Sequence, residues 1–460
     1  MGQVFTPKDI VSEMLDKIEF TSKNIVTYKI MEPSFGDGAF LSQIVERIIR
    51  YCRYIGFDDD KTLSIVLNNV YGIEKDETFY KKGIENIRKV LICEGIEYDG
   101  DFPNLYNADT VEMYPLFLNT FDVVIGNPPY VRIKNIENIA DVKGLTFSGH
   151  GMTDLYIAFF DIGIQMLNKT GKLCFITPNS YFNSSAGKVM REYIVNNSLL
   201  TGVKNFGHKQ LFENATTYCC ITTLDKNNKI KVIAYEDSSD NTKFLDYNTF
   251  FIKGGFYFTD NCEFSNVLHY VGPSVCSVKN GCATLLDKFF IDSEIAKGSA
   301  FSVPIIKAST GKEYLCFYPY NKNGDIIDFD VIDEIEPHTA KLLKDNHVSL
   351  EKRAIDKGCA WYGFGRAQAI GDTYKQKYAI NSLYKTISDV HIYPCESGCA
   401  VYGGLYVLTE LSESELASIL QTKEYIDYVT SIGKYKNGGY YTVSSKEVER
   451  FINYYANKKK

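Results

Sequence analysis

The stretch Phe121-Asp-Val-Val-Ile-Gly126, followed by Asn127-Pro128-Pro129-Tyr130, decides the fold of this chain of 460 residues. The apolar run has the length of a buried strand, and the two prolines cannot continue a sheet or a helix. The tetrapeptide must therefore lie at the carboxyl end of the strand. Because open α/β sheets bind ligands at that end, we expect residues 127–130 to line a binding site.

Strand-like apolar runs alternate with helix-patterned stretches up to about residue 225. Strands are expected at 30–31, 69–73, 122–125 and 172–177, and helices at 39–54 and 155–167. The second helix should begin at Thr153 or Asp154 and end at residues 168–171. This alternation predicts an α/β fold with a doubly wound, mostly parallel sheet.

The polar stretch 236–242 marks the expected domain boundary. Beyond it the chain loses the alternation and becomes rich in Tyr, Gly and short mixed segments. We therefore expect a first domain over residues 1–240 and a second, α+β domain over 241–460. The acidic run 325–336 contains no basic residue, which predicts a solvated face or loop.

Composition is that of a globular protein, with 45% hydrophobic residues and no apolar run as long as a membrane span. The N-terminus has no targeting pattern, so a cytoplasmic location is expected. The twelve cysteines lack metal-ligand spacing, which predicts reduced, mostly buried thiols and no metal site. The formal charge of −7 argues against nucleic acid as a partner, but residues 241–460 hold 25 Lys and Arg against 26 Asp and Glu and leave room for a basic face.

Further signals occur in order where strands should end. The segment 31–41 contains Glu32 and a glycine turn with Gly36 and Gly38, and the acids Glu74 and Asp109 follow later. Taken singly, the turn fits an ordinary strand-to-helix connection, and each acid fits a solvated carboxylate at a strand end.

Together these motifs resemble those of the N6-adenine DNA methyltransferases of the gamma arrangement, the TaqI-like group. The resemblance runs from residue 2 to about 224 and is carried by 3–7, 32–40, Glu74, Asp109, 127–130, 171–182 and 211–218. It implies a Rossmann-like methyltransferase domain that binds S-adenosylmethionine. The implied cofactor-binding residues are Thr6, Glu32, Pro33, Gly36, Gly38, Glu74 and Asp109.

Each role makes physical sense. Glu74 suits the ribose hydroxyls, Asp109 the adenine amine of the cofactor, and Thr6 and Glu32 its methionine end. Asp76 and Glu77 are weaker candidates for the ribose role.

The tetrapeptide can hold an exocyclic amine. Adenine N6 is a poor nucleophile, and the Asn127 side-chain oxygen and the Pro128 carbonyl can accept its two hydrogens without a metal or strong base. The target base must be flipped out of the duplex. Tyr130 offers one flat face and, by resemblance, Phe212 the other, although Phe212 also fits a core aromatic. The catalytic set is Asn127, Pro128, Pro129, Tyr130 and Phe212.

Two segments of the second half, 361–368 and 433–441, resemble DNA-recognition regions of related enzymes. Arg366 suits guanine, Gln368 suits adenine, and Lys434 or Lys436 suits phosphate. An exposed turn with structural aromatics is an equally good interpretation for each single residue.

The sequence therefore predicts a site-specific DNA adenine-N6 methyltransferase of a restriction-modification or related defence system, acting on double-stranded DNA. A restriction endonuclease, if one exists, should be a separate polypeptide. The alternatives are methylation of cytosine N4, whose enzymes more often have Ser at position 127, methylation of RNA or of a protein glutamine, and a catalytically silent DNA-binding protein that retains the fold.

Overall fold

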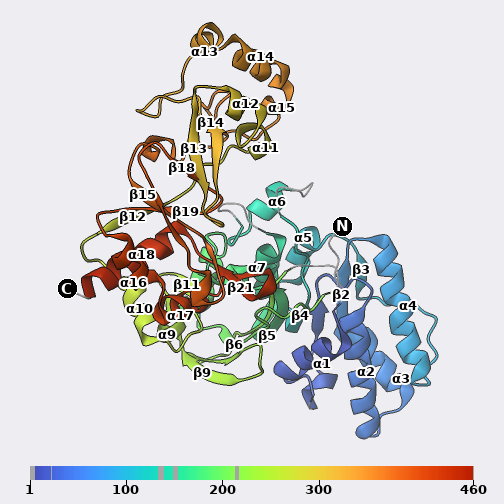
Figure 1. Cartoon of the computed structure of the whole chain (residues 1–460). Coiled ribbons are helices and arrows are strands. Elements are labelled where there is room, and N and C mark those ends of the chain that lie inside the picture. Colours follow the sequence, from blue (N-terminus) through green and yellow to red (C-terminus); the bar gives the residue numbers. More distant parts are fainter. Residues whose placement is uncertain (1–5, 22, 133–138, 149–153, 213–216, 459–460) are drawn as a thin grey trace. The chain divides into compact units, whose positions relative to one another are not determined.

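The computed structural model describes residues 6–21, 23–132, 139–148, 154–212 and 217–458. The chain forms two compact units, Met1–Phe258 and Thr259–Lys460 (Figure 1).

The first unit is built on a nine-stranded sheet with the order β3-β2-β1-β4-β5-β7-β6-β8-β9. Strands β1 to β5 are parallel, β7 runs antiparallel between β5 and β6, and β9 pairs antiparallel with β8. The strands are β1 (Ile30–Glu32), β2 (Val70–Glu74), β3 (Leu105–Asn107), β4 (Phe121–Gly126), β5 (Leu167–Pro178), β6 (Leu200–Asn205), β7 (Cys219–Asp225), β8 (Val232–Glu236) and β9 (Thr242–Asp246).

Helices cover both faces of this sheet. Val124 of β4 packs in a cluster with residues of α7 and α8, whereas its neighbours Val123 and Ile125 pack with residues of α1 and α2. The main helices are α1 (Lys8–Lys17), α2 (Ala39–Tyr54), α3 (Asp59–Asn69), α4 (Glu77–Cys93), α7 (Leu155–Met166) and α8 (Lys188–Asn196). Burial on both faces explains the continuous apolar run of β4. The predicted doubly wound α/β fold is confirmed.

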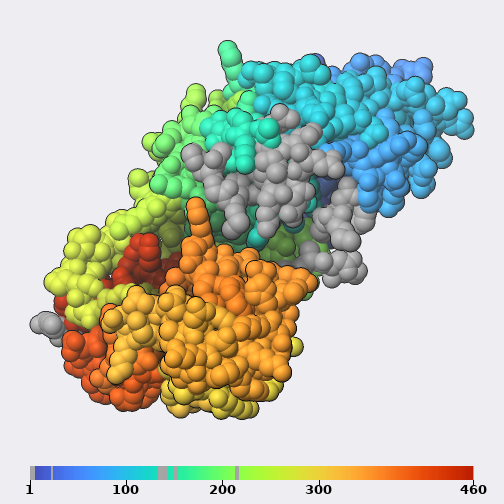
Figure 2. Space-filling view, turned by 90° about the horizontal axis from the view of Figure 1, so that it is seen from above, coloured from blue at the N-terminus to red at the C-terminus, as the bar shows by residue number. Residues whose placement is uncertain are grey.

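Shorter elements complete the first unit. They are η1 (Lys23–Val26), α5 (Thr110–Met113), η2 (Tyr114–Phe117), α6 (Ile139–Lys143), η4 (Asn179–Phe182), α9 (Tyr247–Phe250), β10 (Phe251–Ile252) and β11 (Gly255–Phe256). Helix α2 contacts both α3 and α4, and this part of the unit forms one continuous blue-to-cyan surface in the space-filling view (Figure 2).

Local structure differs from expectation in two places. Helix α7 begins at Leu155 as expected and ends at Met166, one residue earlier than expected. Asp154 is its N-cap residue, while Thr153 lies outside the described residues. Residues 168–171, expected to end that helix, instead lie within β5, which begins at Leu167. They form an irregularity in the pairing with β4, between the pairs Phe121–Leu167 and Val123–Lys172.

The expected boundary after residue 240 falls inside a hairpin. The Asp237 carboxylate accepts hydrogen bonds from the Ser239 and Asn241 backbone amides and closes the turn between β8 and β9. Strand β9 thus continues the first sheet, and the compact units divide after Phe258. Polar turn residues have the same composition at a hairpin as at a linker.

The second unit mixes small, mostly antiparallel sheets with helices, so the predicted α+β class is confirmed. Its sheets have the orders β12-β19-β15-β17, β14-β13-β18 and β16-β21-β20. The strands are β12 (Cys276–Asn280), β13 (Ser302–Lys307), β14 (Glu313–Phe317), β15 (Lys377–Ile380), β16 (Leu383–Tyr384), β17 (Ile392–Cys395), β18 (Ala400–Tyr402), β19 (Leu405–Thr409), β20 (Tyr435–Lys436) and β21 (Tyr440–Thr442).

The helices of this unit are α10 (Cys262–His269), α11 (Asp287–Phe290), α12 (Glu294–Gly298), α13 (Phe329–Ile335), α14 (Pro337–Asp345), α15 (His347–Glu351), η5 (Ile370–Asp372), η6 (Ile387–Asp389), α16 (Glu413–Leu420), α17 (Lys423–Ile432), η7 (Asn437–Gly439) and α18 (Ser445–Lys458). The acidic run forms α13, whose one buried residue is Ile332, so it is a solvated face as predicted.

All twelve cysteines are free thiols and nine of them are buried, as predicted. Within the described residues, every helix is too short or too polar to cross a membrane.

Candidate active site

A pocket of about 800 Å³ lies at the carboxyl ends of the parallel strands. The chain leaves β3 at one side of the sheet and enters β4 on the other side of β1, so β1 and β4 flank a switch point, where ligands bind in such sheets. The predicted residues that line the pocket are Thr6, Glu32, Pro33, Gly36, Glu74, Asp109, Asn127, Pro128, Pro129 and Tyr130.

Glu74, the last residue of β2, is held by backbone donors. Its two carboxylate oxygens accept hydrogen bonds of 2.8 Å from the amides of Gly36 and Asp76. Gly36 has a φ of 54°, a conformation that favours glycine. Burial raises the pKa of Glu74, and the hydrogen bonds from Asp76 and Gly36 oppose that rise. The glycine turn therefore fixes the orientation of this carboxylate.

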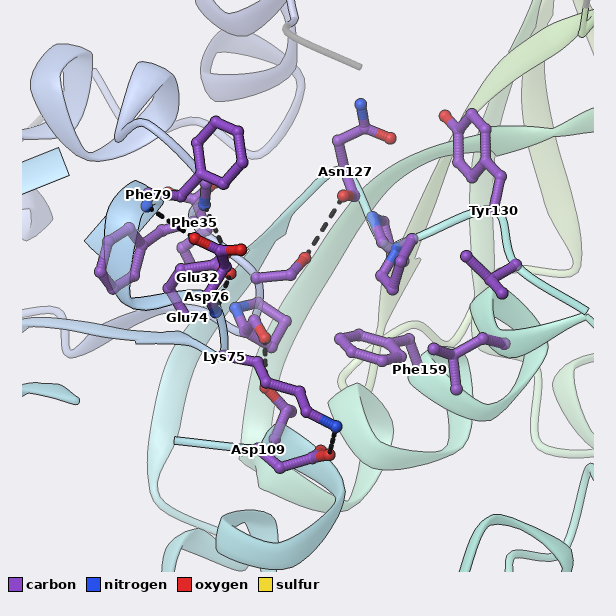
Figure 3. A pocket seen from close by; sticks show the side chains of 18 of the residues that line it. Glu32, Phe35, Glu74, Lys75, Asp76, Phe79, Asp109, Asn127, Tyr130 and Phe159 are labelled. Atoms are coloured by element: carbon purple, nitrogen blue, oxygen red, sulfur yellow. Dashed lines mark hydrogen bonds and ion pairs between the residues drawn. The ribbon is translucent and has the colours of Figure 1, made fainter. Parts of the chain in front are cut away.

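Glu32, the last residue of β1, is buried with only 2% of its surface exposed. Its Oε2 atom has no hydrogen-bond partner among the described residues. Burial, and then the neighbouring Glu74, raise the pKa of Glu32 well above the usual range. Gly126 of β4 lies beside this side chain, and a Cβ there would make an ordinary van der Waals contact of 3.4 Å with the Glu32 Cγ atom. Glu32 and Glu74 lie close together on one side of the pocket (Figure 3).

Asp109 follows β3 and is the N-cap of α5. Its Oδ1 atom accepts from the Val111 amide at 2.8 Å, and its Oδ2 atom is 3.0 Å from the Lys75 ammonium group. Lys75 was not predicted to belong to the site, because its exposed side chain carries no signal in a single sequence.

Asn127 leads the tetrapeptide that follows β4. Its Nδ2 atom donates to the Thr6 hydroxyl at 3.2 Å, and its backbone carbonyl accepts from the Ser34 hydroxyl at 3.3 Å. The chain N-terminal to α1 and the turn after β1 thus both position Asn127. In Figure 3 it lies across the pocket from the two glutamates.

Tyr130 is anchored at both ends of its side chain. Its hydroxyl donates to the Ile176 carbonyl at 3.2 Å, and its ring meets the edge of Tyr156 at a centroid distance of 6.4 Å. Burial raises the pKa of the Tyr130 phenol well above its usual range, so the ring stays neutral. The side chain lines the pocket as a rigid aromatic wall.

Apolar side chains that sequence reasoning missed complete the pocket. Leu155 and Phe159, one turn apart on α7, line it together with Val142 of α6. Phe35 forms another wall, and its ring fills the space beside two glycines, since a Cβ at Gly72 or Gly83 would stand 2.7 Å from it. The spacing of Leu155 and Phe159 was a visible signal, but it is equally typical of a core-facing helix.

Two predicted residues lie away from the pocket lining. Gly38 caps α2 at a φ of 80°, and a Cβ there would come 3.1 Å from the Gly83 backbone, so it permits close packing of α2 and α4. Phe212 is 4% exposed and packs in the hydrophobic cluster of α1 and α2. Residues 213–216, which follow it, lie outside the described residues.

Most residues of the second unit that were predicted to contact DNA form hydrogen bonds or ion pairs with other residues of that unit. Arg366 lies 3.0 Å from the Asp356 carboxylate and also donates to the Ala354 carbonyl. Gln368 donates to the Gly281 carbonyl at 2.9 Å, and Lys434 pairs with Glu447 at 2.6 Å. Lys436 is exposed on β20, and within the described residues its ammonium group has no ion-pair or hydrogen-bond partner.

The pocket fits an adenosyl amino acid with a positive charge. Glu74 is preoriented at a strand end, aromatic rings form apolar walls, and Glu32 offers a buried carboxyl oxygen that has no partner in the described structure. Among the described residues, no group of three or more His, Cys, Asp or Glu side chains is placed to hold a metal ion.

The fold is that of the Rossmann-like methyltransferases, and solved structures share it over most of the chain. The restriction-modification enzyme MmeI, solved with DNA, aligns with 95% of this chain and 65% of its own at a TM-score of 0.62 and 13% identity. The enzyme LlaGI, solved as a nuclease-deletion mutant with a DNA substrate mimic, aligns with 97% of this chain and 54% of its own at a TM-score of 0.58 and 12% identity.

Sequence comparison identifies the domain. Residues 74–212, which include the tetrapeptide, match the family described as Eco57I restriction-modification methylase. This part of the chain is therefore similar to a restriction-modification methylase domain, and the predicted resemblance to a methyltransferase of restriction-modification type is confirmed.

Relatives extend the match. The restriction enzyme and methyltransferase RM.Eco57I of Escherichia coli is 24% identical over 93% of this chain and 54% of its own length. The methyltransferase M.BstVI of Geobacillus stearothermophilus is 29% identical over 50% of this chain and 43% of its own length. The chain thus spans about half the length of these relatives.

Proposed function

We propose that the protein is a site-specific DNA adenine-N6 methyltransferase of a restriction-modification system, with S-adenosylmethionine as cofactor. One observation carries the proposal. The tetrapeptide Asn127 to Tyr130 lines the same pocket as Glu32 and Glu74. Groups that can accept hydrogen bonds from a target amine therefore lie in the same pocket as the acids proposed to bind the cofactor.

The cofactor supplies a methyl group bonded to a positively charged sulfur. Glu74 would hold the ribose hydroxyls, because its oxygens are already aimed by two backbone amides and retain further lone pairs. Asp109 would accept from the adenine amine, with Lys75 fixing its carboxylate. Thr6 and Glu32 would contact the methionine end.

Catalysis would rest on positioning and electrostatics. The Asn127 side-chain oxygen and the Pro128 carbonyl accept the two hydrogens of the target amine and localise its lone pair toward the methyl group. Tyr130 stacks on the flipped base with a ring whose hydroxyl is already anchored. The opposite face is assigned to Phe212 by resemblance alone.

Double-stranded DNA is the proposed partner, and the second unit would read its sequence. The MmeI and LlaGI structures were solved with DNA or a DNA mimic, and their folds extend over both units of this chain. RM.Eco57I is named as both a restriction enzyme and a methyltransferase. This name supports an association with restriction, and we propose a restriction endonuclease, separately encoded, as the second partner.

Long-read modification sequencing of DNA from cells that express the protein tests this proposal. We expect N6-methyladenine in one sequence motif with the intact protein and none with Asn127→Ala. The matched control is Asn68→Ala, an exposed α3 residue whose amide binds only Ser64, and it should leave the methylation unchanged.

Other outcomes distinguish the alternatives. N4-methylcytosine in the motif would replace the adenine assignment by the cytosine one. Unmodified DNA from a folded protein that does not bind S-adenosylmethionine would identify a catalytically silent relative. Full methylation by Asn127→Ala would overturn the mechanism.

A further inference from the structure

The two glutamates of the pocket differ in their partners. Both Glu74 oxygens accept backbone hydrogen bonds, whereas Glu32 has one oxygen, Oε2, without a partner among the described residues. A hydrogen bond from the Leu41 backbone stabilises the Glu32 carboxylate. A buried carboxylate with so little compensation is costly to ionise.

Charged groups around Glu32 add to this cost. Glu74 faces it from β2, and Asp37 faces it from the turn after β1. The first turn of α2 contains no acid, and the acid of β4, Asp122, binds the Lys29 amide at the opposite end of the sheet.

Two lysines near the pocket form ion pairs with aspartates. Lys82 of α4 pairs with Asp37 at 3.3 Å, and Lys75 pairs with Asp109 at 3.0 Å. Neither therefore neutralises the pair of glutamates. The pocket has an excess of carboxyl groups and lacks a counter-ion for Glu32 in the described structure.

We propose that Glu32 is a charge-selecting residue, which carries a proton while the pocket is empty and releases it to solution when a cationic ligand enters. The inference rests on the proposed cofactor site. S-adenosylmethionine offers two such cations, its α-ammonium group and its sulfonium. The ligand's charge replaces the proton as the partner of the carboxyl group, so binding and deprotonation are linked.

The linkage has a defined sign. Burial and Glu74 raise the pKa of Glu32 in the empty pocket, and a bound cation lowers it again. Affinity should therefore rise with pH up to the empty-pocket pKa, by about tenfold per pH unit. Above that pKa the affinity should level off.

Titration calorimetry of the full chain tests this, with S-adenosylmethionine and S-adenosylhomocysteine as probes in buffers of different ionisation enthalpy. We expect proton release on binding that approaches one proton per ligand at pH values below the empty-pocket pKa of Glu32. Release with both ligands would identify the ammonium group as the trigger, and release with S-adenosylmethionine alone would identify the sulfonium. Either result supports the proposal.

Variants supply the controls. Glu32→Gln should bind more weakly, release no proton and show a flat pH profile over the range in which the affinity of the intact protein rises. Glu85→Gln makes the same chemical change at an exposed site of α4 and should behave like the intact protein. Glu74→Gln should move the profile to lower pH, because its charge raises the pKa of Glu32.

Two results overturn the inference. Tight binding without proton release, or unchanged release by Glu32→Gln, would exclude Glu32 as the linked group while leaving the proposed function intact. Failure of the folded protein to bind either ligand would overturn the proposed cofactor as well.

Discussion

The two units use their polar side chains in opposite ways. In the first unit, side chains at the ends of β1, β2 and β4 converge on one pocket, and Glu32 retains an oxygen without a partner in the described structure. In the second unit, Arg366, Gln368 and Lys434 donate to acceptors of their own unit. The first arrangement is ready for a ligand, whereas the second must exchange contacts before these residues can bind DNA.

The largest effect is expected in the first unit, at Glu74 of the pocket. Glu74→Ala removes the acceptor of two part-buried backbone amides, and roughly 1–3 kcal/mol, the cost of a fully buried unpaired donor, is the upper range for each. We expect a lower melting temperature and at least a roughly hundredfold weaker affinity for S-adenosylmethionine, since about 1.4 kcal/mol is a factor of ten. Thermal melting and calorimetry measure both.

Glu85→Ala is the matched control, because Glu85 is an exposed acid on the surface of α4 with no proposed role in the pocket. It should leave both quantities nearly unchanged. Intact cofactor affinity in Glu74→Ala would remove this acid from the site.

An intermediate effect is expected at Tyr130. Tyr130→Ala loses the stacking face, which for aromatic–base contacts is worth about 1–3 kcal/mol, or roughly 5- to 150-fold in activity. Tyr130→Phe keeps the ring and loses the contacts of the hydroxyl with the Ile176 carbonyl and the Cys219 thiol, so it should retain most activity. Steady-state methylation of a duplex containing the target site measures both, and equal losses would argue against stacking.

The smallest effect addresses the second unit. Lys436 has no partner among the described residues, so Lys436→Ala should weaken binding to all DNA sequences alike and reduce the salt-dependence slope by about one. Lys434→Ala should have less effect, because Lys434 already pairs with Glu447. Fluorescence anisotropy at several salt concentrations measures both slopes.

Equal effects of the two substitutions would show that the Lys434 pair opens on binding. If neither changes the slope, the segment 433–441 does not contact phosphate.

The residues that the sequence could identify are those whose position follows from topology. Glu74 ends β2 and Asn127 directly follows β4, two strands that lie on either side of β1 in a parallel arrangement, and the carboxyl ends of such strands meet at one edge. Their place in the pocket was therefore predictable from the strand pattern alone.

Other features depend on packing that no local pattern encodes. Phe159 lines the pocket only because α7 is rotated to present it, and the same spacing describes a core helix. Phe212 lies in a hydrophobic cluster, where an aromatic residue is equally at home. The acceptors that hold Arg366 come from a loop about ten residues away in the chain, so no local pattern around Arg366 could indicate them.

Gly72 and Gly83 lie behind the wall of the pocket that Phe35 forms. The Phe35 ring occupies the space that a methyl group at either position would need. A single added carbon there would push the ring elsewhere, and Phe35 itself borders the pocket. Two positions outside the pocket lining thus determine where one of its walls can stand, and substitutions there should change the shape of the pocket without altering any residue that lines it.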